Sequence, residues 1–426
     1  MATSLRASFP TNVILPRCIP FIDRIQNPLA LQKSMDRYFG VIYWGSRPLE
    51  FFMKIFSLCF MVGFLLLCFS CMFWVNPLEV PPDMYLNMWF YLAASTFVIL
   101  QWITLLPNRH HYAKIVQYLS DLQRTDPFHP FRIRSRAMIF LSTAFLLAMN
   151  TSMAIFWGFL LFGSCPMAFV FDDPFVKKLF SVIYPIQSAY LATLSNGGMV
   201  TCFAVLLVFT VEFSIIGEDL REAFNSGNRD QIRSCIKRHQ RLLEMVNLFR
   251  DKIRFFLLVV VGLYFLLVTF SSFLVVLQLH SGDVQALRYN MINAGFSIIT
   301  IVLYGVVCDL LEETIQEVGN QVYSSAWPST LILDRKHRNV YNSGKRSLMM
   351  VIARSQQKVG FTCGGIYQMS TVTSIAPAVL LLSVYCTVEC NELIMFFGYS
   401  VPFDGSANWH LKYICILSCK SLGSPL

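Results

Sequence analysis

The residue types that could support catalysis or metal binding are scattered along this sequence. Thirteen cysteines occur, many within apolar runs and without the short spacings of a metal site, so we expect most to act as small buried hydrophobes. His110 and His111 follow Arg109 in a basic segment, where a solvated surface is the simplest interpretation. No apolar segment carries a cluster of His, Asp and Glu that would suggest a proton relay or a hydrolytic centre. The sequence therefore predicts no enzyme and no cofactor.

A second pattern combines aromatic and weakly polar side chains toward one end of several apolar segments. A lining that is mostly apolar, with a few hydroxyl and amide groups, is typical of pockets for small neutral organic molecules. The alternative interpretation is ordinary packing together with an interfacial aromatic belt. The candidate ligand-binding residues are Trp89, Phe90, Tyr91, Asn150, Met153, Trp157, Tyr184, Gln187, Tyr190 and Phe296.

The elements that must position these residues are membrane helices. Of the 426 residues, 55% are hydrophobic and only 14% are charged, whereas soluble domains carry about 25% charged residues. Seven segments approach or exceed the roughly 20 apolar residues that a membrane-spanning helix needs. They are 51–74, 84–106, 137–163, 181–213, 253–279, 290–311 and 365–387. The sequence therefore predicts an all-α membrane protein with seven transmembrane helices.

Lys and Arg residues then predict the orientation of these spans. They are frequent before the first span and in the loops after the second, fourth and sixth. The loop after the first span has none, the loop after the third has Lys177 and Lys178, and the loop after the fifth has only Arg288. Because basic loops stay in the cytoplasm, the N-terminus is predicted to be cytoplasmic and the C-terminus extracellular. This topology is inverted relative to G-protein-coupled receptors.

Helical patterns also continue beyond the spans. Residues 218–250 read as helix with a break near Asn225-Ser-Gly-Asn228, and 307–322 extend the sixth span inward. Leu348, Val351, Ile352, Ser355 and Val359 would share one face of an amphipathic helix ended by Gly364-Gly365. An apolar stripe on such helices must be buried, either against neighbouring helices of the same chain or against another subunit.

The stretch from Tyr323 to about Ser374 carries a family resemblance. Tyr323-Ser-Ser-Ala-Trp327, Arg354-Ser-Gln-Gln-Lys358 and Thr362-Cys-Gly-Gly365 together resemble the C-terminal signature of insect odorant receptors. Lys358 and Cys363 stand where that family usually has Pro and Ala. The inverted topology agrees with this resemblance and was obtained without it.

The resemblance implies an odour-tuning receptor subunit at the plasma membrane, in the dendrite of olfactory sensory neurons. Such subunits bind small volatile molecules between the outer halves of the second to sixth spans. With a common co-receptor they form a hetero-tetrameric, odorant-gated, non-selective cation channel in membrane lipid, with no role for nucleic acid. By this resemblance the pore or gate would include Val379, Leu382 and Ser383, and the subunit interface would include Tyr323, Trp327, Leu348, Ile352 and Gln356.

The resemblance also divides the chain. Residues 1–50 form a cytoplasmic segment, 51–387 form the seven-helix domain with cytoplasmic extensions at about 214–252 and 312–364, and 388–426 form an atypical tail. The chain follows the family pattern to about Ser374 and then places Pro377 inside the last span, so a non-conducting splice variant is one alternative. A gustatory-type receptor of the same topology and a small-molecule transporter are the others. The transporter is the less favoured alternative, because the predicted spans show neither paired interrupted helices nor an intramembrane charge for coupling.

Overall fold

The computed structural model describes Leu29 and residues 47–74, 82–125, 129–160, 173–281, 284–325, 338–357 and 359–375. This part of the chain is almost entirely helical. In order, its elements are α3 (Arg47–Trp74), α4 (Pro82–Leu105), the 3-10 helix η1 (Leu106–Asn108), α5 (Arg109–Thr125), α6 (Pro130–Leu160), α7 (Pro174–Ser226), α8 (Arg229–Ser281), α9 (Val284–Ser324), α11 (Arg338–Ser355), and the strands β1 (Thr362–Cys363) and β2 (Tyr367–Gln368). The prediction of an all-helical protein is confirmed, apart from this short two-stranded hairpin.

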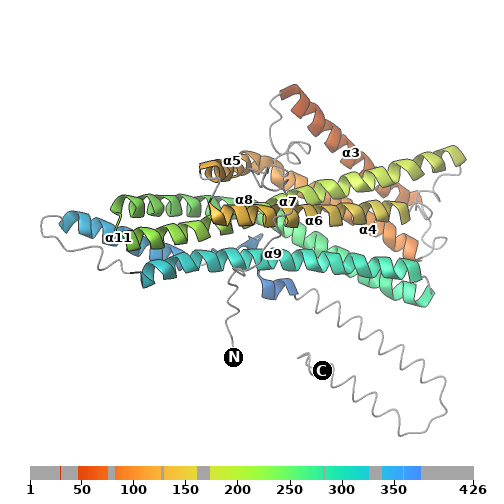
Figure 1. Cartoon of the computed structure of the whole chain (residues 1–426). Helices are drawn as coiled ribbons and strands as arrows, with labels where there is room; N and C mark the ends of the chain where they lie inside the picture. Colours follow the sequence, from red (N-terminus) through yellow and green to blue (C-terminus); the bar gives the residue numbers. More distant parts are fainter. Residues whose placement is uncertain are drawn as a thin grey trace, which may run out of the picture.

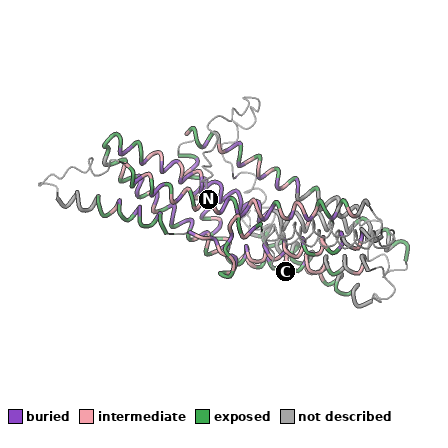
Figure 2. Tube along the Cα trace, turned by 90° about the horizontal axis from the view of Figure 1, so that it is seen from below, coloured by how far each residue is buried: buried purple, intermediate pink, exposed green. Residues whose placement is uncertain are grey.

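The long helices α7, α8 and α9 run together along the length of the molecule, with α11 beside them near one end (Figure 1). Buried residues gather along the middle of these helices (Figure 2). Three described stretches are long and apolar enough to cross a membrane, namely Gly197–Ser226, Asp230–Val275 and Asn290–Ser324. The predicted first six spans fall on α3, α4, α6, α7, α8 and α9, although residues 161–163 of the third lie outside the described residues.

The break between α7 and α8 lies where the sequence predicts it. Asp173 caps the start of α7 by accepting a hydrogen bond from the Phe175 backbone N–H, and Pro174 occupies the first turn, where it suits a helix. At the other end Gly227 has φ 67°, a left-handed conformation that favours glycine, and α8 starts at Arg229. The predicted helical continuation of the sixth span over 307–322 is also confirmed, because α9 runs without interruption to Ser324.

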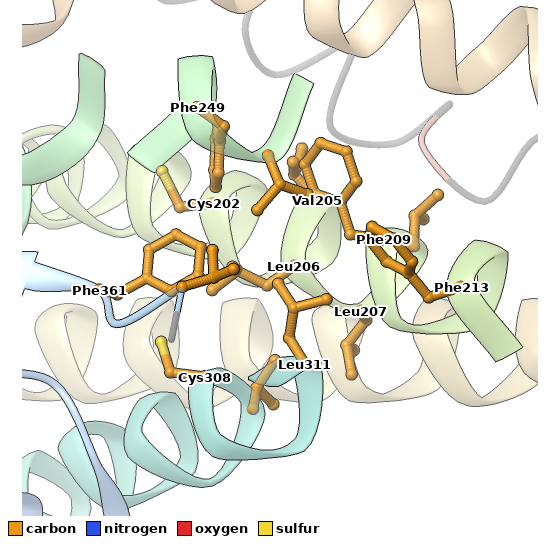
Figure 3. Close-up of a cluster of buried hydrophobic side chains, with 14 of the residues drawn as sticks. Cys202, Val205, Leu206, Leu207, Phe209, Phe213, Phe249, Cys308, Leu311 and Phe361 are labelled. Atoms are coloured by element: carbon orange, nitrogen blue, oxygen red, sulfur yellow. The ribbon is translucent and has the colours of Figure 1, made fainter. Parts of the chain in front are cut away.

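The hydrophobic core lies where α7 passes between α8 and α9. Phe209 and Phe213 of α7, Phe249 of α8 and Leu311 of α9 are fully or almost fully buried. Figure 3 shows their side chains meeting one another, with Phe361 entering the same cluster from the segment before β1. The ring centroids of Phe249 and Phe361 lie 6.5 Å apart in an edge-to-face arrangement. Removal of this apolar surface from water and lipid contact makes α7 the central helix of the fold.

A buried ion-pair network joins α5, α6, α7 and α8 near the C-terminal part of α7. Both carboxylate oxygens of Glu212 accept hydrogen bonds from Arg132 of α6, each at 2.8 Å, and the two side chains are 0% and 2% exposed. Arg238 of α8 donates to the same carboxylate at 2.8 Å and to Asp219 at 3.1 Å. Gln123 of α5 completes the set with a 2.7 Å hydrogen bond. Because every partner is charged or hydrogen bonded, the burial of Glu212 is compensated.

Helix α11 packs against α8 and α9 toward the end of the bundle where α7 passes to α8. The Ser355 hydroxyl lies 3.2 Å from Nε2 of His239 on α8, and a Cβ atom placed on Gly319 of α9 would lie 2.8 Å from the Ser355 Cβ. His239 is about 21 Å along α8 from Ile253, so it lies beyond the predicted fifth span. Burial, together with the nearby positive charge of Arg354, lowers the pKa of His239 to about 4. His239 therefore stays neutral at physiological pH.

The prediction that one helix runs on to Gly364-Gly365 is wrong. α11 ends at Ser355, and Val359 lies on the segment that leads into β1. Gly364, Gly365 and Ile366 form the turn between β1 and β2, and the two glycines have φ values of 64° and 82°. Two consecutive positive φ values suit a tight hairpin turn and exclude most other residues. The next helix starts at Thr371, so the last span does not begin at Gly365.

We predict that Glu212→Gln strongly destabilises the protein, because it leaves the buried Arg132 guanidinium without its counter-ion. Breaking a buried pair by changing one partner costs about 3–5 kcal/mol. Thermal unfolding of purified protein in detergent should show a large fall in Tm. Glu222→Gln, at an exposed position on the same helix, is the matched control and should leave Tm unchanged. Equal Tm values for the two variants would contradict a stabilising role for this network.

Candidate functional site

The candidate site lies toward one end of the bundle, which we call the outer end. It is the end at which α8 passes to α9, between Ser281 and Val284, and the turn at Gly227 marks the opposite, inner end. α4, α7 and α9 run from outer to inner, whereas α6 and α8 run from inner to outer. The predicted ligand-binding residues lie on α4, α6, α7 and α9, toward the outer ends of these helices.

Two contacts fix the register of the helices below the site. The Tyr304 hydroxyl of α9 donates a hydrogen bond to the Met199 carbonyl of α7, and its ring packs edge-on against Phe203 at 5.6 Å between centroids. On the neighbouring pair, a Cβ atom placed on Gly262 of α8 would lie 3.0 Å from the Phe97 ring of α4. The absence of a side chain at Gly262 therefore lets α4 approach α8 closely.

Helix geometry then places the predicted residues of α7 and α9 at similar depths. At about 1.5 Å per residue, Tyr190 lies about 13 Å outward from Met199, and Phe296 lies about 12 Å outward from Tyr304. A Cβ atom placed on Gly198 of α7 would lie 3.1 Å from Cδ1 of Leu105 on α4, and from these positions Tyr190 lies about 12 Å and Trp89 about 24 Å outward. The backbone register thus brings the α7 and α9 positions into one layer, and Trp89 of α4 lies farther outward.

The α6 positions fit the same layer. Arg132 and Glu212 are hydrogen bonded, so they mark a common depth on α6 and α7. Met153 lies about 31 Å outward from Arg132, and Tyr190 lies about 33 Å outward from Glu212. Asn150 and Trp157 flank Met153 within about 6 Å along the helix. That their side chains line one cavity stays a prediction.

The structure describes only three of the predicted ligand-binding side chains. Tyr190 and Phe296 are half-buried, and Phe296 packs against the hydrophobic core. Trp89 is 45% exposed and lies edge-on to Tyr85, with ring centroids 6.5 Å apart. For the other residues the helix is described but the side chain lies outside the described set, namely Phe90, Tyr91, Asn150, Met153, Trp157, Tyr184 and Gln187.

A line of polar side chains, all buried except the half-buried Asn293, joins α8 to α9 beside this layer. We call it the polar seam, and it consists of Tyr264, Ser271 and Gln278 on α8 and Asn290, Asn293, Ser297, Thr300 and Tyr304 on α9. Asn290 donates a hydrogen bond to Gln278 at 2.9 Å, and Asn293 donates to the Ser271 hydroxyl at 3.1 Å. The Thr300 hydroxyl donates a hydrogen bond to the Phe296 carbonyl of its own helix at 2.8 Å.

The seam places amide and hydroxyl groups one turn on either side of Phe296. Asn293 precedes Phe296 by three residues and Thr300 follows it by four, which puts all three near one face of α9. A site with Phe296 at its wall would therefore combine an aromatic surface with a few hydrogen-bonding groups. That chemistry suits a small, mostly apolar molecule with one or two polar atoms.

None of the residues of the seam is among the ligand-binding residues predicted from the sequence. Its signal is the seven-residue spacing of Tyr264, Ser271 and Gln278, which keeps three polar side chains on one face of α8. Asn290, Ser297 and Tyr304 repeat that spacing on α9, and Asn293 and Thr300 repeat it once more. Polar residues at such spacing in apolar helices indicate helix pairing.

The predicted subunit-interface residues differ in where they lie. Leu348 and Ile352 are buried inside this chain, where α11 packs against α8 and α9, whereas Tyr323 and Gln356 are exposed. Trp327 and the predicted pore residues Val379, Leu382 and Ser383 lie outside the described residues. Within the part of the chain that the structure describes, no group of three or more His, Cys, Asp or Glu side chains could hold a metal ion.

Comparison with known proteins agrees with this architecture. A family model described as 7tm odorant receptor matches residues 123–376. No curated protein matches the sequence. Two solved structures of the insect olfactory receptor OR5 from Machilis hrabei share the fold with a TM-score of 0.61. The one in complex with eugenol is 13% identical and the match covers 86% of this chain and 97% of that chain, and the other is 12% identical with 85% and 98% covered.

We predict that the buried amide pair of the polar seam stabilises the fold only as a pair. Gln278→Leu or Asn290→Leu alone removes the hydrogen bond between the two buried amides, and breaking one side of such a bond costs about 1–3 kcal/mol. Both should lower Tm in detergent, and the double variant should recover most of the loss, because an apolar pair needs no hydrogen bond. A double variant whose loss equals the sum of the single losses would contradict a direct interaction.

Proposed function

Because this chain belongs to the 7tm odorant receptor family, we propose that it binds small volatile organic molecules and, with a common co-receptor subunit, forms an odorant-gated non-selective cation channel. The family match over more than half of the chain is the observation that carries this proposal. The family consists of receptors rather than enzymes. The shared fold with an insect olfactory receptor over most of both chains supports it.

The proposed ligand site is the layer of α6, α7 and α9 positions around Phe296 and Tyr190, beside the polar seam, with the α4 residues Trp89, Phe90 and Tyr91 at its outer side. The layer offers aromatic surface and neutral hydrogen-bonding groups. A neutral molecule would bind there chiefly by apolar burial, at about 25 cal/mol per Å². The structural neighbour was solved in complex with eugenol, so a small phenol is a reasonable first probe for this chain.

The proposed topology has seven spans, with a cytoplasmic N-terminus and an extracellular C-terminus. α8 is 53 residues long and α9 is 41, so both exceed the roughly 30 Å hydrocarbon core of a bilayer by a wide margin. Their apolar parts cross the membrane and their inner parts project into the cytoplasm, where the predicted basic segments lie. We keep the division of the chain into a cytoplasmic segment (1–50), a seven-helix domain (51–387) and a tail (388–426).

The proposed assembly is a hetero-tetramer with the co-receptor in the plasma membrane of olfactory dendrites. The exposed Tyr323 and Gln356 would contact a neighbouring subunit directly, together with Trp327. Leu348 and Ile352 are buried within the chain, so they would act by holding α11 in place. Val379, Leu382 and Ser383 of the last span would line the pore. An odorant that binds the open arrangement more tightly would shift the population toward conduction.

We predict that Phe296→Ala raises the half-maximal odorant concentration about tenfold or more, because apolar contacts in a ligand pocket are worth about 1–3 kcal/mol. The measurement is odorant-evoked cation current from cells that express the chain with its co-receptor, with eugenol and other volatile molecules as probes. Surface labelling must show that wild-type and variant receptors reach the membrane equally.

The matched control for this prediction is Phe273→Ala, because Phe273 on α8 is 61% exposed and faces away from the seam partners of α9. It should leave the odorant response unchanged. An unchanged response of Phe296→Ala at equal surface amount would exclude Phe296 from the ligand site. The absence of current from wild-type receptor over a wide panel would instead contradict the conducting function.

We also predict how epitope tags will stain intact cells. A tag at Met1 and a tag inserted at the exposed turn of Gly227 should both stain only after permeabilisation, because both lie on the cytoplasmic side of the proposed topology. A tag at the C-terminus should stain without permeabilisation. Staining of the Met1 tag on intact cells would overturn the orientation.

A further inference from the structure

The start of the last described helix is held by a reciprocal cap. Residues 371–375 form a helical turn directly after the hairpin. The Ser370 hydroxyl accepts a hydrogen bond from the Thr373 backbone N–H at 3.3 Å, and the Thr373 hydroxyl accepts one from the Ser370 N–H at 3.0 Å. This arrangement is a capping box with Thr in the third position, so Ser370 is the N-cap and Thr371 is the first helical residue. The local sequence therefore satisfies two of the free N–H groups.

A third N–H group at this helix start is satisfied by another helix. Oδ2 of Asp309 on α9 accepts a hydrogen bond from the Thr371 N–H at 2.7 Å. The sequence separation of 62 residues makes this a tertiary contact. A carboxylate near a helix N-terminus also interacts favourably with the helix dipole. Asp309 thus binds the first turn of the last helix to α9 by a short, charge-assisted hydrogen bond.

Close backbone packing occurs one turn outward along α9. A Cβ atom on Gly305 would lie 2.4 Å from the Ser374 hydroxyl oxygen and 2.6 Å from the Ser370 carbonyl oxygen. Real Cβ atoms do not approach other atoms so closely, so Gly305 is required for this contact. Ser374 is fully buried here. The last helix therefore touches α9 at two successive turns, through Gly305 and through Asp309.

The hairpin ties the same helix start to α8. The Gly364 N–H donates a hydrogen bond to the Arg254 carbonyl of α8 at 2.8 Å, and the Met369 N–H donates to the Phe361 carbonyl at 2.8 Å within the hairpin. The Tyr367 hydroxyl also donates to the Thr373 carbonyl in the first helical turn. The helix start is thus fixed to α8 through the hairpin and to α9 through Asp309. A shift of α9 relative to α8 must displace one of these attachments.

We propose that Asp309 is the positioning residue that transmits movement of α9 to the last helix, and hence from the ligand site to the pore. This inference rests on the proposed ligand-gated function. Phe296 lies on α9 about 20 Å outward from Asp309, and α9 is unbroken between them. A displacement of α9 at the ligand site is therefore felt at Asp309 as a rigid-body movement. A population shift requires a contact that differs between the closed and open arrangements. Here that contact is the hydrogen bond from the Thr371 N–H to Asp309.

The test removes each side of this hydrogen bond separately. Asp309→Ala removes the acceptor, and Asp309→Asn keeps an oxygen acceptor without the charge. Thr371→Pro removes the donor, because proline has no backbone N–H. Proline is well accepted at the first helical position and suits an extended N-cap before it. Each variant and the Asp309→Ala/Thr371→Pro double variant is expressed with the co-receptor, and odorant-evoked current and surface amount are measured.

We expect Asp309→Ala and Thr371→Pro each to raise the half-maximal odorant concentration by about fivefold or more, in the range of typical coupling between sites. Asp309→Asn should show a smaller rise. The double variant should resemble the single variants, because both remove the same hydrogen bond. Additive effects, or responses equal to wild type at equal surface amount, would overturn the proposal. A merely structural role would lower the surface amount and the thermal stability, and would leave the half-maximal odorant concentration of the receptors that reach the membrane unchanged.

Glycine variants give an independent arm of the test. Gly305→Ala on α9 should impair the odorant response as Asp309→Ala does, because the added methyl group separates the last helix from α9. Gly63→Ala on α3 is the control, since a Cβ atom there meets nothing within 4 Å and Gly63 lies outside the proposed ligand layer. Equal responses of the two glycine variants would contradict the coupling contact. Wild-type current remains the check on the proposed function, so its failure is distinguishable from failure of this inference.

Discussion

Polar side chains on helices that cross an apolar medium have no water to bind, so each must find its partner on a neighbouring helix. This constraint shapes the whole arrangement. The Glu212 carboxylate accepts hydrogen bonds from Arg132, Arg238 and Gln123. Gln278 pairs with Asn290, and Ser271 pairs with Asn293. Each pair fixes the register of two helices, and the registers together decide which residues share a depth at the outer end.

The two ends of the bundle are held by interactions of different strength. The inner half has a charged network, a hydrophobic core of phenylalanines and the packed α11 helix. The outer half has neutral hydrogen bonds between α8 and α9, which are worth about 0.6 kcal/mol each on average in a membrane. The distribution of charge and packing thus gives a firmer frame at the inner end and a weaker one at the outer end, where the proposed ligand site lies.

Much of the helical fold could be predicted from the sequence because it depends on local patterns. Apolar segments of sufficient length predict the helices, and the glycine near Asn228 predicts the break between α7 and α8. The hairpin after α11 was missed, because Ile366 and Tyr367 continue an apolar pattern and two glycines suit a helix end as well as a hairpin turn. Only the paired backbone of β1 and β2 decides between these two structures.

Contacts between distant residues could not be predicted in the same way. Nothing in the sequence selects Glu212 as the partner of Arg132, since many acidic residues lie in inner segments. The candidate ligand residues were recognisable by type, but their common depth follows only from contacts such as Tyr304 with Met199. The hairpin has one more consequence. The start of the last helix is held by two hydrogen bonds within the protein, from Gly364 to Arg254 and from Thr371 to Asp309. The depth of this helix start is therefore set by α8 and α9, and it does not follow changes in bilayer thickness.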